Sequence, residues 1–144
     1  MFARELISQN ILPLKTSDTG ITALNWMDEF RVAHLPIVNT TKFLGVIADI
    51  DIYNLNKPDE PLGNHNLSLK RPFVYENQHI FDVIKTIANL KLSLIPVIDD
   101  KENYLGVITL LHLVQNFSEI SALQNPGGII ILELNSNDYS MSQI

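Results

Sequence analysis

The sequence lacks cysteine, a signal peptide and any long run of apolar residues. Without cysteine, disulfides, thiolate metal sites and cysteine nucleophiles are excluded. The longest apolar stretch, Ile129 to Leu132, is the size of a strand, whereas a bilayer-spanning helix needs roughly 18–20 apolar residues. The N-terminus, MFARELISQN, differs from a signal peptide because no apolar run follows its early positive charge. We therefore expect a cytoplasmic protein with no membrane partner.

Positive charge is scarce as well. The 144 residues include 10 Lys and Arg against 16 Asp and Glu, which gives a formal net charge of −6 at pH 7. Because surfaces that bind nucleic acids are usually basic, this balance argues against a nucleic-acid partner. Lys70 and Arg71 are the only adjacent basic residues, and we expect them in a solvated loop. Hydrophobic residues make up 46% of the chain, which is enough for the core of a compact domain.

An internal repeat organises the chain. LPIV at 35–38 aligns with IPVI at 95–98, an offset of 60 residues from Pro36 to Pro96. FLGVI at 43–47 aligns with YLGVI at 104–108, an offset of 61 residues from Gly45 to Gly106. Upstream apolar positions agree with the same frame, so the repeat covers a whole structural unit.

Each unit is predicted to have the order β-α-β-β-α, because apolar residues spaced by three and four precede two short apolar strands. The predicted elements lie at residues 11–14, 21–30, 36–38, 43–48 and from Ile50 in the first unit, and at 73–75, 80–90, 96–98, 104–109 and from Leu110 in the second. The last helix of each unit is expected to be short. Polar residues before the longer helices provide candidate N-caps, either Ser17 or Asp18 in the first unit and Asn77 in the second.

The chain divides into four segments on this pattern. We assign residues 1–56 to the first unit, 57–68 to a linker, 69–123 to the second unit and 124–144 to a C-terminal segment. Two prolines and a glycine mark the linker. A strand pair with helices on one face leaves its other face bare, so two such units are expected to cover each other.

The doubled pattern resembles a known family. An apolar–Pro–apolar–apolar strand is followed by a turn and by Gly–apolar–apolar–(Ser/Thr)–x–x–Asp, and this occurs twice over about residues 1–123. The pattern resembles a pair of cystathionine-β-synthase (CBS) domains, or Bateman module. The resemblance implies an α+β fold of two β-α-β-β-α units related by pseudo-twofold symmetry, with the sheets packed together and the helices outside. It also implies a regulatory module with two ligand clefts, and commonly a homodimer of two modules.

The resemblance further implies which residues form the clefts. In the family motif, the Asp carboxylate accepts hydrogen bonds from ribose hydroxyls, and the Ser or Thr hydroxyl helps with phosphate or ribose. Backbone groups just before the Pro strand of the opposite unit read the adenine edge. Carried over to this chain, cleft two is predicted to contain Ala48, Asp51, Leu92, Ser93 and Leu94, and cleft one to contain Thr109, His112, Val32, Ala33, His34 and Thr16.

Each predicted cleft keeps half of the family's polar pair. Cleft two has Asp51 but carries Ala48 in place of the hydroxyl, whereas cleft one has Thr109 but carries His112 in place of the carboxylate. A neutral imidazole has one acceptor nitrogen, so it cannot bind both ribose hydroxyls. With His34 in the same cleft, the imidazoles could bind an anion when protonated or contribute to a metal site, or be half-buried surface residues. We assign no metal site, because no Asp, Glu or Cys is mapped beside them.

The segment 124–144 suggests a further domain. Asn125-Pro126-Gly127-Gly128 breaks the chain, Ile129–Leu134 is predicted as a strand, and a helix is predicted to start near Met141. This opening looks like the start of an ACT-like small-molecule-binding domain. A strand and one helical turn cannot bury their own apolar face. The segment is therefore added to the module, swapped to a partner chain, or part of a longer protein, and our hypothesis is that the sequence belongs to a longer regulatory protein.

These features lead to two functional hypotheses. The first is a ligand-sensing module that binds AMP, ADP, ATP or S-adenosylmethionine, needs no cofactor, and transmits a conformational change. The alternative is a dimerisation scaffold whose degenerate clefts bind nothing. The sequence contains no Ser-His-Asp order, no Gly-rich phosphate loop and no H-E-x-x-H pattern, so we predict no catalytic residues and no enzyme activity.

Overall fold

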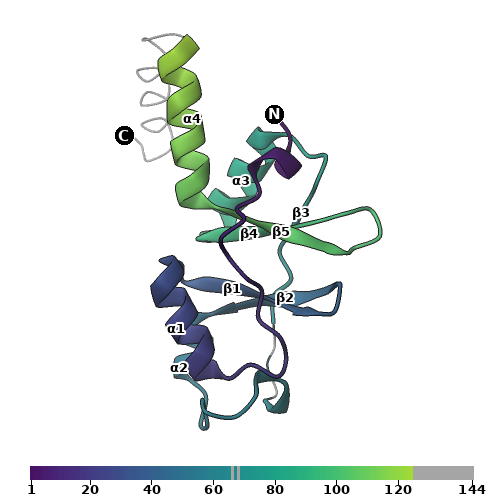
Figure 1. The fold of residues 1–144 in the computed structure, drawn as a ribbon, viewed down its shortest axis with the longest axis vertical. Coiled ribbons are helices and arrows are strands. Elements are labelled where there is room, and N and C mark those ends of the chain that lie inside the picture. Colours follow the sequence, from purple (N-terminus) through teal and green to yellow (C-terminus); the bar gives the residue numbers. More distant parts are fainter. Residues whose placement is uncertain (66, 68, 125–144) are drawn as a thin grey trace. The chain divides into compact units, whose positions relative to one another are not determined.

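The sequence repeat is a repeat of structure in the computed structural model (Figure 1). The first repeat contains α1 (Gly20–Phe30), β1 (His34–Asn39), β2 (Lys42–Ala48) and α2 (Asp49–Tyr53). The second contains β3 (Val74–Tyr75), α3 (Ile80–Leu90), β4 (Leu94–Ile98), β5 (Tyr104–Thr109) and α4 (Leu110–Gln124). Two short 3-10 helices, η1 (Ala3–Leu6) and η2 (Leu62–Asn64), precede the repeats. The predicted α+β class is confirmed.

The structure describes residues 1–65, 67 and 69–124. The chain forms two compact units, Met1–Leu110 and Leu111–Ile144. The larger unit holds both sheets, and the described part of the smaller one is helical. Helix α4 is 15 residues long, so the prediction of a short final helix is wrong for the second repeat. The strand predicted at Ile129–Leu134 and the helix predicted near Met141 lie outside the described residues.

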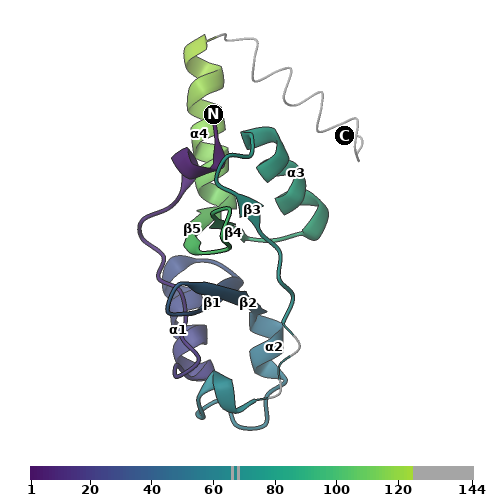
Figure 2. The same cartoon turned by 90° about the vertical axis from the view of Figure 1, so that its right-hand side faces the viewer.

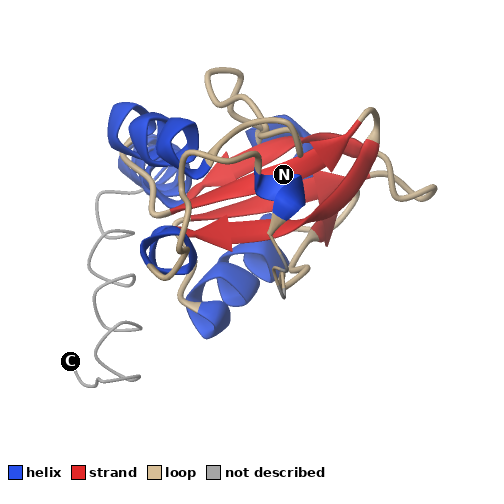
Figure 3. Cartoon of the chain, turned by 90° about the horizontal axis from the view of Figure 1, so that it is seen from below, coloured by secondary structure: helices blue, strands red, loops and turns tan. Residues whose placement is uncertain are grey.

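Each repeat is built on an antiparallel hairpin. Strand β1 pairs with β2, and β4 pairs with β5, with a β-bulge at the same place in both hairpins. In the second repeat β3 runs parallel to β4. In the first, the segment predicted at residues 11–14 contributes a single parallel bridge from Leu14 to Ile37. The sheets lie at the centre with α1 and α2 outside the first and α3 outside the second (Figures 2 and 3).

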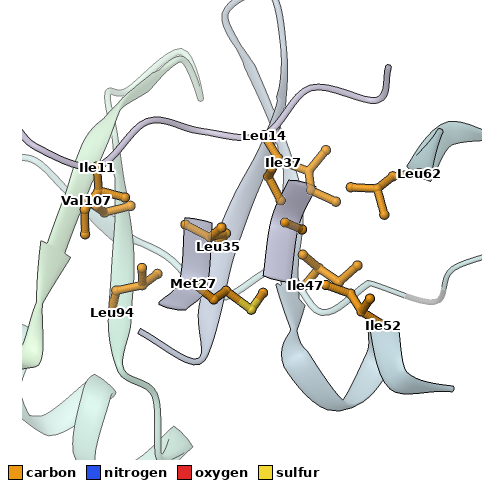
Figure 4. Close-up of a cluster of buried hydrophobic side chains, with 11 residues drawn as sticks. Ile11, Leu14, Met27, Leu35, Ile37, Ile47, Ile52, Leu62, Leu94 and Val107 are labelled. Atoms are coloured by element: carbon orange, nitrogen blue, oxygen red, sulfur yellow. The ribbon is translucent and has the colours of Figure 1, made fainter. Parts of the chain in front are cut away.

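One hydrophobic cluster joins the two sheets (Figure 4). Leu35 and Ile47 of the first hairpin belong to the same buried cluster as Leu94 and Val107 of the second. Met27 of α1 belongs to the same cluster. Because the shared apolar surface is removed from water only when both sheets are present, the two repeats are expected to fold as one body.

The segments that precede the two repeats are exchanged. Residues 1–8, the N-terminal segment, pack on the second repeat: the backbone N–H of Ala3 donates to the carbonyl of Gln78 (2.8 Å), and that of Ser8 donates to Val107 (2.8 Å). Residues 57–65, 67 and 69–70, the connecting segment, pack on the first repeat. The described residues of the predicted linker, 57–65 and 67, therefore include a segment that packs on the first repeat through η2.

The connecting segment makes contacts that match those of the N-terminal segment. The N–H of Gly63 donates to the carbonyl of Thr16 (2.9 Å), and the N–H of Val46 donates to the carbonyl of Lys70 (2.9 Å). Lys70 bridges Val46 on β2 just as Ser8 bridges Val107 on β5. Lys70 and Ser8 therefore occupy equivalent positions in the two repeats.

The repeated glycine is required where each exchanged segment crosses a hairpin. A Cβ atom added to Gly106 would lie 2.5 Å from Cγ2 of Ile7, and one added to Gly45 would lie 2.8 Å from Cβ of Leu69. Real Cβ atoms do not approach carbon atoms so closely, so a larger residue displaces the crossing segment. This close approach accounts for the glycine that occurs at the same position in both repeats.

The N-caps of the two long helices differ from those predicted. Thr19 caps α1, with its side chain accepting from the N–H of Thr22, and His79 caps α3, with Nδ1 accepting from the N–H of Phe81 (both 3.1 Å). Ser17, Asp18 and Asn77 are therefore not the caps. Both true caps bridge an exchanged segment, Thr19 to Pro61 and His79 to Phe2. Docking of these segments sets where each helix begins.

Candidate functional site

A cavity of about 420 Å³ lies between the two repeats within the larger unit. The first repeat contributes the end of β2 and the first turn of α2, the second contributes the end of α3 and the residues before β4, and the connecting segment closes one side. The lining residues are Val46, Ala48, Ile50, Asp51, Lys70, Pro72, Leu90 and Leu92. We call this cavity cleft two, because three residues predicted for that cleft line it.

The first turn of α2 positions Asp51. The N–H of Ala48, the residue before the helix, donates to Oδ2 of Asp51 (2.9 Å), and the N–H of Ile50 donates to Oδ1 of Asp49 (2.7 Å). This local bond fixes the Asp51 side chain at the rim of the cavity. Within the described part of the chain, Oδ1 of Asp51 has no hydrogen bond, so it is available to accept one from a ligand.

Lys70 supplies the cationic side of the cavity. Its backbone is held on β2 by the hydrogen bond from Val46, and its side chain is exposed. The next residue, Arg71, has its charge engaged elsewhere: Nη2 donates to Oε1 of Glu102 (2.9 Å), and the guanidinium stacks on Phe43 and Phe73. Lys70 is therefore the one residue with a basic side chain among the described residues that line this cavity.

The sequence prediction missed five lining residues. Val46 lies two residues before Ala48 on β2, so the strand period of two could have indicated it. Ile50 lies in the first turn of α2 next to Asp51, and Leu90 is the last residue of α3, so strand periodicity indicates neither of them. Lys70 and Pro72 carried no local signal, because their position depends on the exchange of the connecting segment.

Two of the residues predicted for cleft two do not line it. Leu94 is fully buried in the shared hydrophobic cluster. Ser93 instead connects the two repeats: its Oγ accepts from the N–H of Ala33 (3.1 Å) and lies 2.8 Å from Nδ1 of His34. The N–H of Ser93 also points at the same Nδ1 (3.3 Å).

This arrangement favours the neutral form of His34. With Nδ1 unprotonated, it accepts from both the N–H and the hydroxyl of Ser93. Burial lowers the pKa of His34 below its ordinary value, and the carboxylates of Asp49 and Asp51 oppose that shift. The imidazole is therefore a structural acceptor at the junction of the two repeats.

The residues predicted for cleft one are found in several environments. Thr109 is buried, and Val32 packs against the shared hydrophobic cluster. The carbonyl of Ala33 accepts from the N–H of Asp49 (3.0 Å), and Thr16 is exposed with its carbonyl bonded to the connecting segment. His112 lies on α4 in the smaller unit, where Nδ2 of Asn116 is 3.1 Å from its Nε2. The grouping of His34 with His112 stays a prediction.

Two other kinds of site were searched for in the described residues. Across residues 1–65, 67 and 69–124, no group of three or more His, Cys, Asp or Glu side chains is placed to hold a metal ion. Across the same residues, no helix is long and apolar enough to cross a membrane. The arrangement that remains is a largely apolar cavity with one carboxylate and one ammonium group.

Known proteins share this architecture. Residues 67–119 match the family model of the CBS domain. The fold is similar to that of a CBS domain pair/ACT domain protein from Thermotoga maritima (TM-score 0.71, 21% identity, covering 83% of this chain and 98% of that one). It is also similar to CBSX2 from Arabidopsis thaliana, solved in complex with AMP (TM-score 0.68, 21% identity, covering 83% and 97%).

A third similar structure is the CBS domain of a bacterial CNNM/CorC family Mg²⁺ transporter in complex with ATP (TM-score 0.61, 16% identity, covering 80% and 85%). The family match to the second repeat, the doubled fold and these likenesses agree. The second repeat matches the CBS domain, and the chain has the fold of a CBS domain pair, as the doubled sequence pattern predicted.

Proposed function

We propose that this CBS pair is a regulatory module that binds an adenosine-containing nucleotide in cleft two. The observation that carries the proposal is the position of Asp51 at the rim of a cavity whose walls are otherwise mostly apolar. Ligand sites of this kind combine apolar walls with a few placed polar groups. A volume of about 420 Å³ falls within the usual range for small-molecule sites.

The lining chemistry fits the parts of a nucleotide. Val46, Pro72 and Leu92 offer apolar surface for the faces of a flat base. The free Oδ1 of Asp51 accepts a ribose hydroxyl, and an ionised carboxylate is the stronger acceptor for this purpose. The solved complexes of CBSX2 with AMP and of the transporter CBS domain with ATP support the same ligand class.

Binding in this cavity would couple the two repeats. Asp51 belongs to the first repeat and Leu92 to the second, so a bound nucleotide contacts both. The junction beside the cavity holds the repeats through Ser93 and His34. A ligand that fits one relative position of the repeats better than another shifts the population toward it, and this shift is the regulatory signal. We propose no catalytic role and no required cofactor, and the cytoplasmic location remains a prediction.

A scaffold role is the second candidate, and exposed apolar side chains favour it. Tyr53 of α2 and Phe81 of α3 are 68% and 63% exposed. Aromatic residues of this kind are enriched at protein interfaces. We propose that the module forms a homodimer through these outer helices, and light scattering of the wild type and of Tyr53→Ser tests this. A wild-type monomer at micromolar concentration would contradict it.

Thermal unfolding with and without ligand tests the proposed function. A ligand at about 100 times its dissociation constant stabilises the folded state by roughly 2.7 kcal/mol. The wild type is expected to shift upward by several degrees with at least one of AMP, ADP, ATP or S-adenosylmethionine. Asp51→Ala should lose about ten- to hundredfold in affinity, because it removes a charged acceptor.

Asp49→Ala is the matched control. It also removes a carboxylate from the first turn of α2, but Asp49 does not line the cavity. Retained binding in Asp49→Ala with lost binding in Asp51→Ala supports the proposal. If none of the four ligands stabilises the wild type, the scaffold is the better account.

A further inference from the structure

The charged residues that line the cavity bear on which nucleotide it would bind. Among the described residues that line it, Lys70 is the one cation and Asp51 the one anion. Arg71 cannot add a second positive charge without giving up its bond to Glu102 and its contacts with two aromatic rings. Asp49 adds a further negative charge in the same turn as Asp51.

Each additional phosphate on a ligand needs compensating charge. A phosphate monoester carries about −1.5 to −2 charge at pH 7, and sites that bind longer phosphate chains supply several Arg or Lys groups or a Mg²⁺ ion. The single lysine can pair with one phosphate group, and the two carboxylates beside it disfavour any further negative charge, so a triphosphate is left largely uncompensated.

We propose that Lys70 binds the phosphate of the ligand and that cleft two selects nucleoside monophosphates over triphosphates. The inference rests on the proposed function, because it assumes a nucleoside in the cavity. Lys70 belongs to the exchanged connecting segment. Its backbone is fixed at the site because its carbonyl accepts a hydrogen bond from Val46 of β2. The equivalent position in the second repeat is Ser8, which has no charge. The charge at this position is therefore a property of cleft two and not a requirement of the fold.

Calorimetric titration of adenosine, AMP and ATP into the full chain tests the proposal. The wild type is expected to bind AMP about ten- to hundredfold more tightly than adenosine, which is the range for one charge-assisted hydrogen bond. Lys70→Gln should abolish that difference and leave the affinity for adenosine within about twofold. ATP without Mg²⁺ should bind more weakly than AMP.

Lys85→Gln is the matched control, because Lys85 is an exposed lysine of α3 that does not line the cavity. It should bind AMP as the wild type does. Equal affinities for adenosine and AMP in the wild type would overturn the role of Lys70, as would an equal loss of AMP affinity in both variants. ATP binding as tight as AMP binding would overturn the selectivity. Binding of ATP without binding of AMP would overturn this inference and leave the proposed function standing. If none of AMP, ADP, ATP and S-adenosylmethionine binds, the proposed function fails, and this inference fails with it.

Discussion

Replacing Gly106 by Ala tests the exchanged packing of the N-terminal segment. The new Cβ would lie 2.5 Å from Cγ2 of Ile7, whereas the next atom of that side chain, Cβ, is 3.8 Å away. The overlap is therefore with one methyl group. Overpacking of this kind costs about 1–3 kcal/mol. For a chain of this length we expect the melting temperature to fall by roughly 4–12 °C.

The structure also predicts which second substitution relieves the strain. Ile7→Ala removes the overlapping methyl group, so the double variant Ile7→Ala/Gly106→Ala should be more stable than the sum of the two single effects by about 1 kcal/mol. Gly45→Ala is the contrasting case. There the nearest atoms are Cβ of Leu69 and the carbonyl oxygen of Lys70, at 2.8 and 2.9 Å. Leu69→Ala leaves both atoms in place, so it should rescue nothing.

Urea unfolding of the single and double variants measures the coupling free energy between Ile7 and Gly106 and that between Leu69 and Gly45. Two-state fits give the free energy of unfolding for each variant. A Gly106→Ala protein as stable as the wild type, within about 0.3 kcal/mol, would refute the crossing geometry. Strict additivity with Ile7→Ala would do the same, because the cost would then arise elsewhere.

Three further predictions concern single side chains. The pKa of His34 is lowered in the folded state, so its contribution to stability is present above the unfolded-state pKa near 6.5 and is lost as the pH falls through the folded-state pKa. His34→Asn should therefore flatten the pH dependence of the free energy of unfolding. Urea titrations between about pH 5 and 8 would detect this change. The Tyr104 hydroxyl is buried without a hydrogen-bond partner among the described residues, and Phe43 occupies the equivalent position in the first hairpin. Tyr104→Phe should therefore be neutral or stabilising by about 1 kcal/mol in thermal unfolding. Thr19→Ala should cost about 1 kcal/mol through loss of the N-cap, whereas Ser17→Ala should change chemical stability little; the reverse order would contradict the cap assignment.

Periodicity and the doubled motif predicted most of the local structure. The spacing of apolar residues placed α3 at the residues where it is found, because an amphipathic helix must bury Val83 and Ile87 on one face. The strands that contain Pro36 and Pro96 (β1 and β4) and those that contain Gly45 and Gly106 (β2 and β5) were predicted from their apolar residues, because both hairpins are buried in a shared core. The caps Thr19 and His79 were missed, because docking of the exchanged segments decides where each helix starts.

The residues of the candidate site were likewise predicted only in part. Ala48 ends β2 and Asp51 lies in the first turn of α2, so the motif alone predicted them at the cavity. Leu94 was assigned to the cleft by its position before Pro96, yet both faces of β4 are covered and the side chain is buried in the core. Lys70 could not be found from the sequence pattern, because it reaches the cavity by pairing with β2 of the opposite repeat.

The most direct test of the account is a crystal structure of the chain grown with AMP. The account predicts AMP in cleft two, with a ribose hydroxyl about 2.5–3.0 Å from Oδ1 of Asp51, the base between Val46 and Leu92, and the phosphate at Lys70. AMP bound at another place, or a cavity without AMP in crystals saturated with it, would contradict the proposal that this chain senses an adenosine nucleotide through cleft two.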